Sequence, residues 1–305
     1  MYLGIDVGGT KVALRLEGAG EEGEPAEAVL RWPDAGDPAR DLAALAAGIA
    51  GLRERRPGPL TAVGVAMPAT LDRTGRVVAW PNRPSWEGLA LHAELGALLP
   101  DLPPADLRTA DDGDLAGLAE AGAAGVRDLV YLGVGTGVGG GLVLDGRLCP
   151  GPERGSCEIG HLVVDREGRR CDCGRRGCVQ SAASGPAILR RAAELRGGEV
   201  PFAELAPALA AGEGWARQAV REGAQALASA VVGLSELTHP ELAVIGGGFA
   251  AAIPGFVPAV ARQVECLERP GGPRVPVAEA KLGGLSSLYG AVLLARGIRE
   301  AGANA

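Results

Sequence analysis

Two stretches of the chain share one pattern of apolar residues and glycines. Residues 2–16 are apolar, or alternate between apolar and polar, on both sides of the pair Gly8-Gly9. Residues 129–144 repeat this plan around a second glycine-rich stretch at 135–141. Each pattern predicts a strand, a glycine loop and a returning strand. We therefore expect a duplicated α/β unit with a cleft between the two copies.

Apolar residues at helical spacing fill much of the remaining chain. They predict helices around 40–54, 115–124, 185–196, 215–237 and 285–300, and short apolar runs predict buried strands at 61–67 and 242–246. The opening Tyr-Leu-Gly of residues 2–4 recurs at 131–133. From these elements we expect an N-terminal α/β domain at 1–118, which a C-terminal helix at 290–305 can complete. A second α/β domain at 119–289 would contain an insert at 157–180.

Composition and charge exclude several classes of protein. The 305 residues are 47% hydrophobic and 22% charged, which is enough apolar content for a large core and too little for a membrane protein. The net charge of −7 and the lack of a basic run argue against a nucleic-acid partner. Residues 1–6 predict a strand rather than a signal peptide, so we expect a cytoplasmic protein.

Both glycine loops are candidates for binding phosphate, because glycine lets backbone N–H groups approach an anion closely. The loop at 135–140 matches G-x-G-x-x-G, but the segment after it predicts a strand, whereas a dinucleotide fold needs a helix. Residues 8–11 lack the spacing of a P-loop. Asp6 would place a carboxylate beside a metal-bound phosphate. Plain hairpin turns and an ordinary strand-end aspartate are the alternatives.

Three cysteines and a histidine have the spacing of a metal site. Cys171, Cys173 and Cys178 lie within eight residues, and His161 precedes them by ten. In a cytoplasmic chain this spacing favours a closed, structural Cys3His zinc site over a disulfide. Free thiols are the alternative. The remaining cysteines, at 149, 157 and 266, are expected to be buried small apolar residues.

In combination these motifs resemble the ROK family of bacterial sugar kinases and sugar-responsive repressors. The resemblance covers nearly the whole chain and implies the duplicated actin-like/hexokinase (ribonuclease H-like) two-domain fold. It implies transfer of the ATP γ-phosphoryl group to a hexose hydroxyl, with Mg²⁺ on the nucleotide and structural Zn²⁺. The implied phosphate and nucleotide contacts are Asp6, Gly8, Gly9, Thr10, Lys11, Gly135, Thr136, Gly137, Gly139, Gly247 and Gly248. The implied sugar contacts are Asn82, Asp111, Asp112, Glu158, His161 and Gln180.

The resemblance also implies a catalytic base. In the family this base is the aspartate of an Asn-Asp pair, eight residues before a glutamate, and counting back from Glu120 gives Asp112. Asp111 and Asp114 compete with Asp112 for this role, and the other alternative is an acidic first helical turn favoured by the helix dipole. Three positions depart from the family pattern: Asp111 replaces the asparagine, Ala69 replaces a glycine and Gln180 replaces a glutamate. These changes affect the sugar pocket rather than the phosphate machinery.

The resemblance leaves the sugar open. We expect a glucokinase-type enzyme that forms glucose 6-phosphate. The alternatives are a kinase for another hexose or for an N-acetylated amino sugar, and a non-catalytic sugar-binding relative. A repressor is disfavoured, because only five residues precede Asp6 and leave no room for a helix-turn-helix domain. The donor can be ATP or polyphosphate, and family members commonly form dimers or tetramers.

Overall fold

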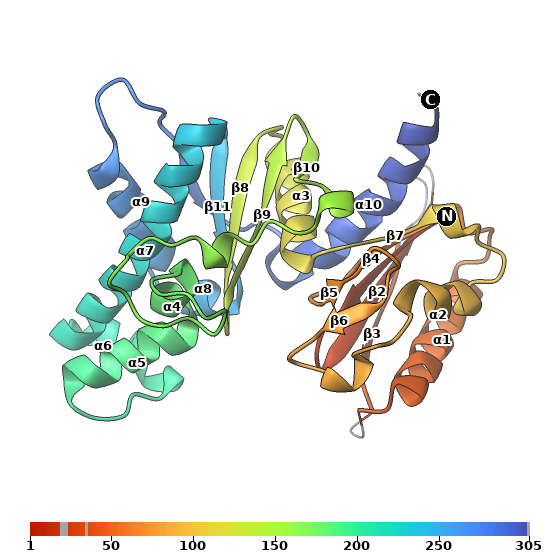
Figure 1. Cartoon of the computed structure of the whole chain (residues 1–305), viewed down its shortest axis with the longest axis horizontal. Coiled ribbons are helices and arrows are strands. Elements are labelled where there is room, and N and C mark those ends of the chain that lie inside the picture. The colour runs from red at the N-terminus through yellow and green to blue at the C-terminus, as the bar shows by residue number, and fades with distance from the viewer. Residues whose placement is uncertain (19–23, 34–35, 304–305) are drawn as a thin grey trace. The chain divides into compact units, whose positions relative to one another are not determined.

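The computed structural model describes residues 1–18, 24–33 and 36–303, and the chain divides into two compact units (Figure 1). Unit 1 comprises Met1–Ala119, Pro150–Ser156 and Leu285–Ala305, and unit 2 comprises Glu120–Cys149 and Cys157–Gly284. The units differ from the expected domains in three places. Ala119 and the segments 150–156 and 285–289, which the sequence analysis assigned to the second domain, belong to unit 1.

Unit 1 is built on a five-stranded sheet with the strand order β3-β2-β1-β4-β7. Strand β1 is antiparallel to β2 and parallel to β4, which is in turn parallel to β7. The strands are β1 (Tyr2–Val7), β2 (Lys11–Glu17), β3 (Ala26–Arg31), β4 (Ala62–Ala66), β7 (Leu107–Ala110) and the separate pair β5 (Thr70–Leu71) and β6 (Val77–Ala79). The helices are α1 (Pro38–Arg55), α2 (Leu91–Leu98), α10 (Ser286–Ala303) and the start of α3 (Asp112–Ala124).

Helices cover both faces of this sheet (Figure 1). Helix α1 starts where the Asp37 side chain accepts a hydrogen bond from the Ala39 amide and Pro38 occupies the first turn. Its buried leucines join the core formed by Leu3, Ile5 and the other residues on one face. Helix α10 packs on the opposite face, where a Cβ on Gly64 would lie 1.9 Å from the Ala291 carbonyl oxygen. Only glycine permits this approach.

Unit 2 repeats the same sheet with the order β10-β9-β8-β11-β12. Strand β8 is antiparallel to β9 and parallel to β11, which is parallel to β12. The strands are β8 (Leu129–Val134), β9 (Val138–Leu144), β10 (Arg147–Cys149), β11 (Leu242–Gly246) and β12 (Val277–Glu279). The helices are α4 (Val179–Ala183), α5 (Gly185–Arg196), α6 (Phe202–Ala211), α7 (Gly214–Thr238), α8 (Gly248–Ala252) and α9 (Phe256–Leu267). Helices α5, α7 and α9 contribute most of its apolar core.

The registers show which residues of the two units correspond. Val7 pairs with Val12 just before the first loop, and Val134 pairs with Val138 just before the second. Val134 is therefore the counterpart of Val7, and Gly133 is the counterpart of Asp6. The recurring Tyr-Leu-Gly triplets would place both correspondences two residues away, so they do not mark equivalent positions.

Two further expectations concern the surface. Cys266 is exposed rather than buried, because the apolar face of α9 presents Val260 and Val264 to the core and residue 266 lies on the other face.

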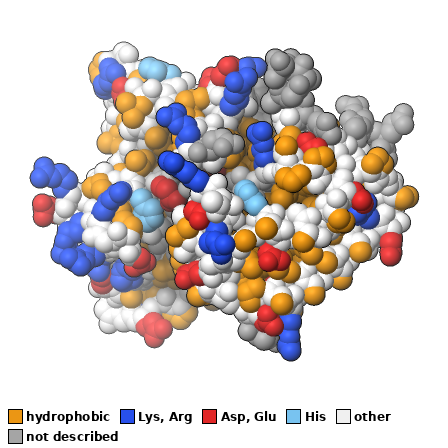
Figure 2. Space-filling model, turned by 45° about the vertical axis from the view of Figure 1, so that its right-hand side comes forward, with side chains coloured by type: hydrophobic (Ala, Val, Ile, Leu, Met, Phe, Trp, Pro, Cys, Tyr) orange, Lys and Arg blue, Asp and Glu red, His pale blue; other side chains and the backbone are white. Residues whose placement is uncertain are grey.

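Among the described residues, no helix is long and apolar enough to cross a membrane. Acidic and basic side chains are interspersed with apolar ones on the face shown in Figure 2.

Candidate functional site

Three aspartates of unit 1 gather at the carboxyl edge of its parallel strands. Asp6 lies opposite Ala66 of β4, and Ala66 lies opposite Ala110, the last residue of β7. Asp111 and Asp112 follow directly. In open α/β sheets this edge is where ligands bind. The structure therefore places Asp112, the candidate base indicated by the sequence spacing, at the same edge as the Asp6 carboxylate.

Asp111 and Asp112 form the N-terminus of α3. The Asp111 side chain accepts a hydrogen bond from the Gly113 amide at 3.0 Å, and its carbonyl oxygen accepts from the Leu115 amide at 3.0 Å. Asp111 is therefore the N-cap residue. Asp112 is the first residue of the helix, and its carbonyl oxygen accepts a hydrogen bond from the Ser287 hydroxyl of α10 at 3.1 Å. The helix dipole favours a carboxylate at this end.

Asp6 has an unusual environment. Its pKa is raised from 3.8 to about 6, chiefly by burial and also by the negative charge of Asp112, while Lys11 partly opposes both effects. The influence of Asp112 on this pKa shows that the two carboxylates are close enough to interact. A site with this much negative charge favours a cation, such as the Mg²⁺ that accompanies a nucleotide.

The first glycine loop joins β1 to β2 beside these carboxylates. The Gly8 amide donates to the Lys11 carbonyl oxygen at 2.9 Å and closes the turn. Asn82 lies against this loop, because a Cβ on Gly9 would be 2.9 Å from the Asn82 Cβ. The structure thus brings together the predicted sugar contact Asn82 and the predicted phosphate loop of unit 1.

A buried polar network holds the first loop, and the sequence analysis missed it. The Arg83 guanidinium forms two hydrogen bonds with the Asp41 carboxylate, at 2.7 and 2.5 Å, and a third with the Gly9 carbonyl oxygen at 3.2 Å. The Trp86 indole donates to Asp41 at 2.8 Å, and the Trp32 indole donates to the Gly8 carbonyl oxygen at 2.6 Å. Asp41 is fully buried. The available signal was Asp41, a charged residue at an otherwise apolar helix position.

The second glycine loop is held by backbone contacts. The Gly135 amide donates to the Gly137 carbonyl oxygen at 2.9 Å, and the Gly185 amide donates to the Gly135 carbonyl oxygen at 2.8 Å. Gly247, at the end of β11, lies against Val134, because a Cβ there would be 2.4 Å from the Val134 carbonyl oxygen. The predicted nucleotide residues at 135–139 and 247–248 are therefore neighbours at the carboxyl edge of unit 2.

The four predicted metal ligands come together. One ligand atom from each of His161, Cys171, Cys173 and Cys178 lies within 4.8 Å of the other three. The His161 Nδ1 is 3.6 Å from the Cys171 Sγ, and the Cys173 and Cys178 sulfurs are 3.6 Å apart. Tetrahedral zinc with Zn–S bonds of about 2.3 Å requires similar separations. The donors fit this metal.

A metal ion would change the protonation of these thiols. The pKa of Cys178 is raised to about 12, chiefly by burial and also by the neighbouring thiol of Cys173. A bound divalent cation would offset the unfavourable desolvation of a thiolate at this position.

Two predicted sugar contacts, Glu158 and Gln180, adjoin the metal cluster. The Nε2 atom of His161 is 4.0 Å from the Glu158 carboxylate. The Gln180 amide donates to the Cys171 Sγ at 3.4 Å, and its Oε1 would be 3.2 Å from a Cβ on Gly137. Gln180 therefore joins the metal cluster to the second glycine loop, and the glutamate of the family pattern lacks a donor for the sulfur.

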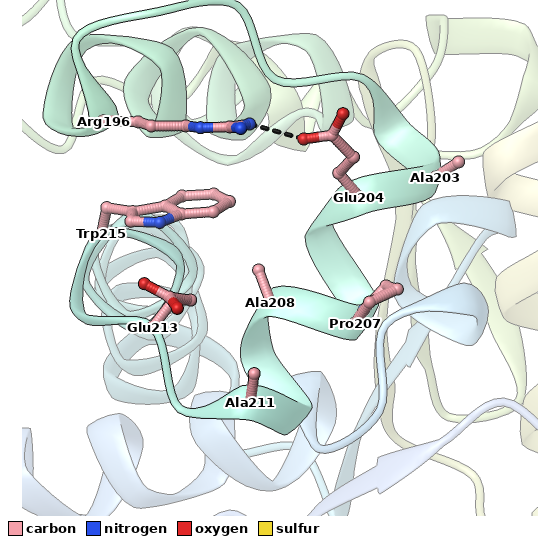
Figure 3. Close-up of a pocket in the computed structure, with 8 residues that line it drawn as sticks. All are labelled: Arg196, Ala203, Glu204, Pro207, Ala208, Ala211, Glu213 and Trp215. Carbon is pink, nitrogen blue, oxygen red and sulfur yellow. Dashed lines mark hydrogen bonds and ion pairs between the residues drawn. The ribbon is translucent and has the colours of Figure 1, made fainter.

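A separate pocket of about 500 Å³ lies between α5, α6 and α7 of unit 2 (Figure 3). The Arg196 guanidinium lies 5.4 Å from the centroid of the Trp215 ring and pairs with Glu204. None of the eight residues that line this pocket is among the residues predicted to bind phosphate, sugar or metal.

Comparison with other sequences identifies a family. The ROK family model matches residues 2–298. A kanosamine kinase from Amycolatopsis mediterranei is 53% identical over 294 residues, which are 96% of this chain and 95% of the relative. An N-acetylmannosamine kinase from Citrobacter koseri is 34% identical over 310 residues, which are 97% of this chain and 98% of that protein.

Solved structures agree with these relatives. The ROK hexokinase from Thermus thermophilus has a TM-score of 0.88 and 29% identity, covering 98% of this chain and 99% of that chain. A ROK family glucokinase from Streptomyces griseus, in complex with glucose and AMPPNP, has a TM-score of 0.73 and 26% identity, covering 97% and 99%. The predicted actin-like fold class is confirmed.

Proposed function

This chain belongs to the ROK family and is a sugar kinase, and we propose that its substrate is kanosamine or a closely related amino hexose, phosphorylated by MgATP. Kanosamine is glucose in which an amine replaces the 3-hydroxyl group. The observation that carries the proposal is the 53% identity to a kanosamine kinase along almost the entire chain. This finding favours an amino hexose over the glucose expected from the sequence analysis.

Asp112 acts as the general base in the proposed reaction. The carboxylate accepts the proton of the sugar's 6-hydroxyl group as the oxygen attacks the γ-phosphorus of ATP, and the bond from that phosphorus to the bridging oxygen of ADP breaks. The products are ADP, the sugar 6-phosphate and a proton. Support comes from the position of Asp112 at the carboxyl edge and at a helix N-terminus, beside the Asp6 carboxylate.

In this proposal the glycine loop of each unit offers backbone amides to phosphate. Gly9, Thr10 and Lys11 contribute from unit 1, and Thr136, Gly137 and Gly139 contribute from unit 2. Gly8 and Gly135 shape the turns, since their amides are hydrogen-bonded within the loops. Gly247 and Gly248 contact the nucleoside. Asp6 faces the metal ion that arrives with ATP.

In this proposal unit 1 offers Asn82 and Asp111 as sugar contacts, and unit 2 offers Glu158 and His161. Gln180 contributes by fixing the Cys171 sulfur and the loop at Gly137. His161, Cys171, Cys173 and Cys178 hold a structural zinc ion, which orders the polar segment around 165–180 and thereby orients His161. A cytoplasmic location and a homo-oligomeric state stay predictions.

The test is a coupled ADP-release assay with a panel of sugars: kanosamine, glucose, mannose, fructose and N-acetylmannosamine. Sugar-independent ATP hydrolysis is the control, and polyphosphate replaces ATP in a parallel series. The proposal expects the highest kcat/KM with kanosamine. Lack of turnover with every sugar would favour a non-catalytic sugar-binding protein. Preference for N-acetylmannosamine would favour the second candidate, which the 34% identity to such a kinase supports.

A further inference from the structure

We infer that Asp111 is the specificity-determining residue of this kinase and that its carboxylate binds the ammonium group of an amino hexose. The inference rests on the function proposed above and deepens it, because it names the group that separates an amino sugar from glucose. Three features of unit 1 carry the argument, namely the place of Asp111, its helix cap and the surrounding charge, and the chemistry of the relatives supports it.

Asp111 lies immediately beside the proposed base. It follows the last residue of β7 and precedes Asp112 at the start of α3. A hexose whose acceptor hydroxyl meets the Asp112 carboxylate therefore brings its other ring substituents close to residue 111. Asp111 is only half-buried, so part of its side chain is accessible to such a ligand.

The helix cap explains why folding does not require a carboxylate at this position. One oxygen of Asp111 accepts the Gly113 amide at 3.0 Å. Asparagine, which the family pattern has here, caps helices about as well as aspartate and would use its own oxygen in the same way. The two residues differ in the other atom of the group, which is an NH₂ donor in asparagine and an acceptor with negative charge in aspartate. Aspartate in place of asparagine therefore changes the interaction between this second atom and a ligand.

The charge around Asp111 is unfavourable for a neutral sugar. Asp6 and Asp112 already place two carboxylates at this edge, and the negative charge of Asp112 raises the pKa of Asp6. A third carboxylate adds repulsion. A neutral hexose does not relieve it, whereas an ammonium group bound among the three offsets it and forms a charge-assisted hydrogen bond.

The relatives are consistent with a cationic substrate. The relative with 53% identity is named for kanosamine, whose amine is protonated near neutral pH. The relatives with 33–34% identity are named for N-acetylmannosamine, whose nitrogen belongs to a neutral amide. A carboxylate at 111 distinguishes these two nitrogen types, because only the ammonium carries a positive charge.

The experiment compares Asp111→Asn with the wild type on kanosamine and glucose. The variant restores the amide of the family pattern and keeps the helix cap. We expect kcat/KM for kanosamine to fall about 10–100-fold, the usual effect of losing a hydrogen bond between charged groups, and kcat/KM for glucose to rise. Changes of opposite sign cannot come from general damage to the fold. The matched control is Asp101→Asn, which removes the same charge from an exposed surface position of unit 1.

The outcomes separate the two proposals. A wild type without turnover on any sugar overturns the proposed function itself. A wild type that prefers glucose overturns the proposed amino-hexose substrate together with the role of Asp111. A variant with equal losses on both sugars overturns the role of Asp111 alone and leaves the proposed function intact. If the variant does not fold, the wild type decides: its preference for kanosamine over glucose should fall at least tenfold as pH rises through the pKa of the sugar's amine. A constant preference overturns the inference.

Discussion

The two units share one sheet topology but present different chemistry at the carboxyl edge. In unit 1 the edge position of β1 is Asp6, whereas its counterpart in unit 2 is Gly133, opposite Gly246. Two residues earlier in these strands, unit 1 has the glycine and unit 2 has the larger side chain. Gly4 of β1 admits helix α10, while Tyr131 of β8 extends its hydroxyl to within 2.7 Å of the Cβ position on Gly246. Unit 1 thus offers carboxylates at this edge, and unit 2 offers bare backbone.

The glycine loops differ in the same sense. Unit 1 holds its loop with the buried Asp41–Arg83 pair and two indoles, and unit 2 holds its loop with the Gly185 amide and the neighbouring Gln180. The two copies of the fold therefore carry different proposed functional groups: unit 1 has the aspartates proposed for acid–base chemistry, and unit 2 has the Cys3His cluster proposed to bind zinc. The four predictions below test this division, beginning with the largest effect.

Replacing the proposed base, Asp112, should have the largest effect. Asp112→Asn keeps the size of the side chain and removes the proton acceptor, so kcat should fall about 10²–10⁴-fold. The measurement is steady-state ADP release with saturating MgATP and kanosamine. Asp101→Asn is the control for the loss of one charge, and it should retain full activity. Near-normal turnover by the Asp112 variant would place the acid–base chemistry outside the edge of unit 1.

Breaking the network that holds the first loop should have the second largest effect, mainly on the free energy of unfolding. Asp41→Asn leaves the Arg83 guanidinium buried without its carboxylate, which typically costs about 3–5 kcal/mol of unfolding free energy. Urea denaturation followed by intrinsic tryptophan fluorescence measures the loss, because Trp32, Trp80 and Trp86 all lie in this core. The KM for ATP should rise as well, since Arg83 also binds the Gly9 carbonyl oxygen.

The exposed Arg53–Asp101 pair supplies the contrast for this prediction, because exposed ion pairs contribute at most about 1 kcal/mol. If Asp41→Asn costs no more than Asp101→Asn, the loop does not depend on the buried pair.

The sequence revealed what local spacing encodes. The predicted metal ligands and both glycine loops are short patterns. The dipeptide Asp145-Gly146 is another, typical of a hairpin turn, and its two residues have positive φ, of 52° and 73°. The helix near 185–196 was predictable too, because Ser184 caps its start and Gly197 ends it in a left-handed conformation.

Other features depend on distant partners and were missed. Asp41 and Arg83 are 42 positions apart, so no local motif joins them. Strand β3 alternates intermediate and exposed residues at the edge of its sheet, and its apolar signal is correspondingly weak. The Tyr-Leu-Gly repeat suggested a correspondence that the strand pairing shifts by two residues. A shift of two keeps each side chain on the same face, so the apolar pattern alone could not reveal the error.

The link between metal cluster and loop in unit 2 should have a moderate effect. Gln180→Met keeps the length of the side chain and removes the donor to the Cys171 Sγ, so zinc affinity should fall about 10–100-fold. Competition with a chromophoric chelator measures the affinity. Gln218→Met is the control, because this glutamine bonds a glutamate on α7 away from the cluster. Equal affinities of the Gln180 variant and the wild type would remove Gln180 from the support of the metal site.

The smallest predicted effect concerns the pH dependence of stability and arises from Asp6. Because its pKa is raised to about 6 in the folded protein, from an ordinary value of 3.8, the folded state binds this proton more tightly than the unfolded chain does. The free energy of unfolding should therefore decrease as pH rises from about 4 to about 6. Asp6→Asn removes that decrease. It should stabilise the protein by about 1–2 kcal/mol above pH 6, a value reduced from the full shift because Asp6 is partly exposed.

Urea denaturation of the wild type and of Asp6→Asn across this pH range tests the sign. The two proteins should be equally stable near pH 4 and should diverge as pH rises, with the variant the more stable and the less active of the pair. Adding MgATP should reduce the difference, because a cation beside Asp6 stabilises its ionised form. The equivalent edge position in unit 2 is Gly133, which has no ionisable side chain, so this position should contribute no such pH dependence of stability. Parallel stability curves would show that the Asp6 carboxylate is as well solvated as an ordinary surface residue, and the contrast between the two sheet edges would then lie in Asp111 and Asp112 alone.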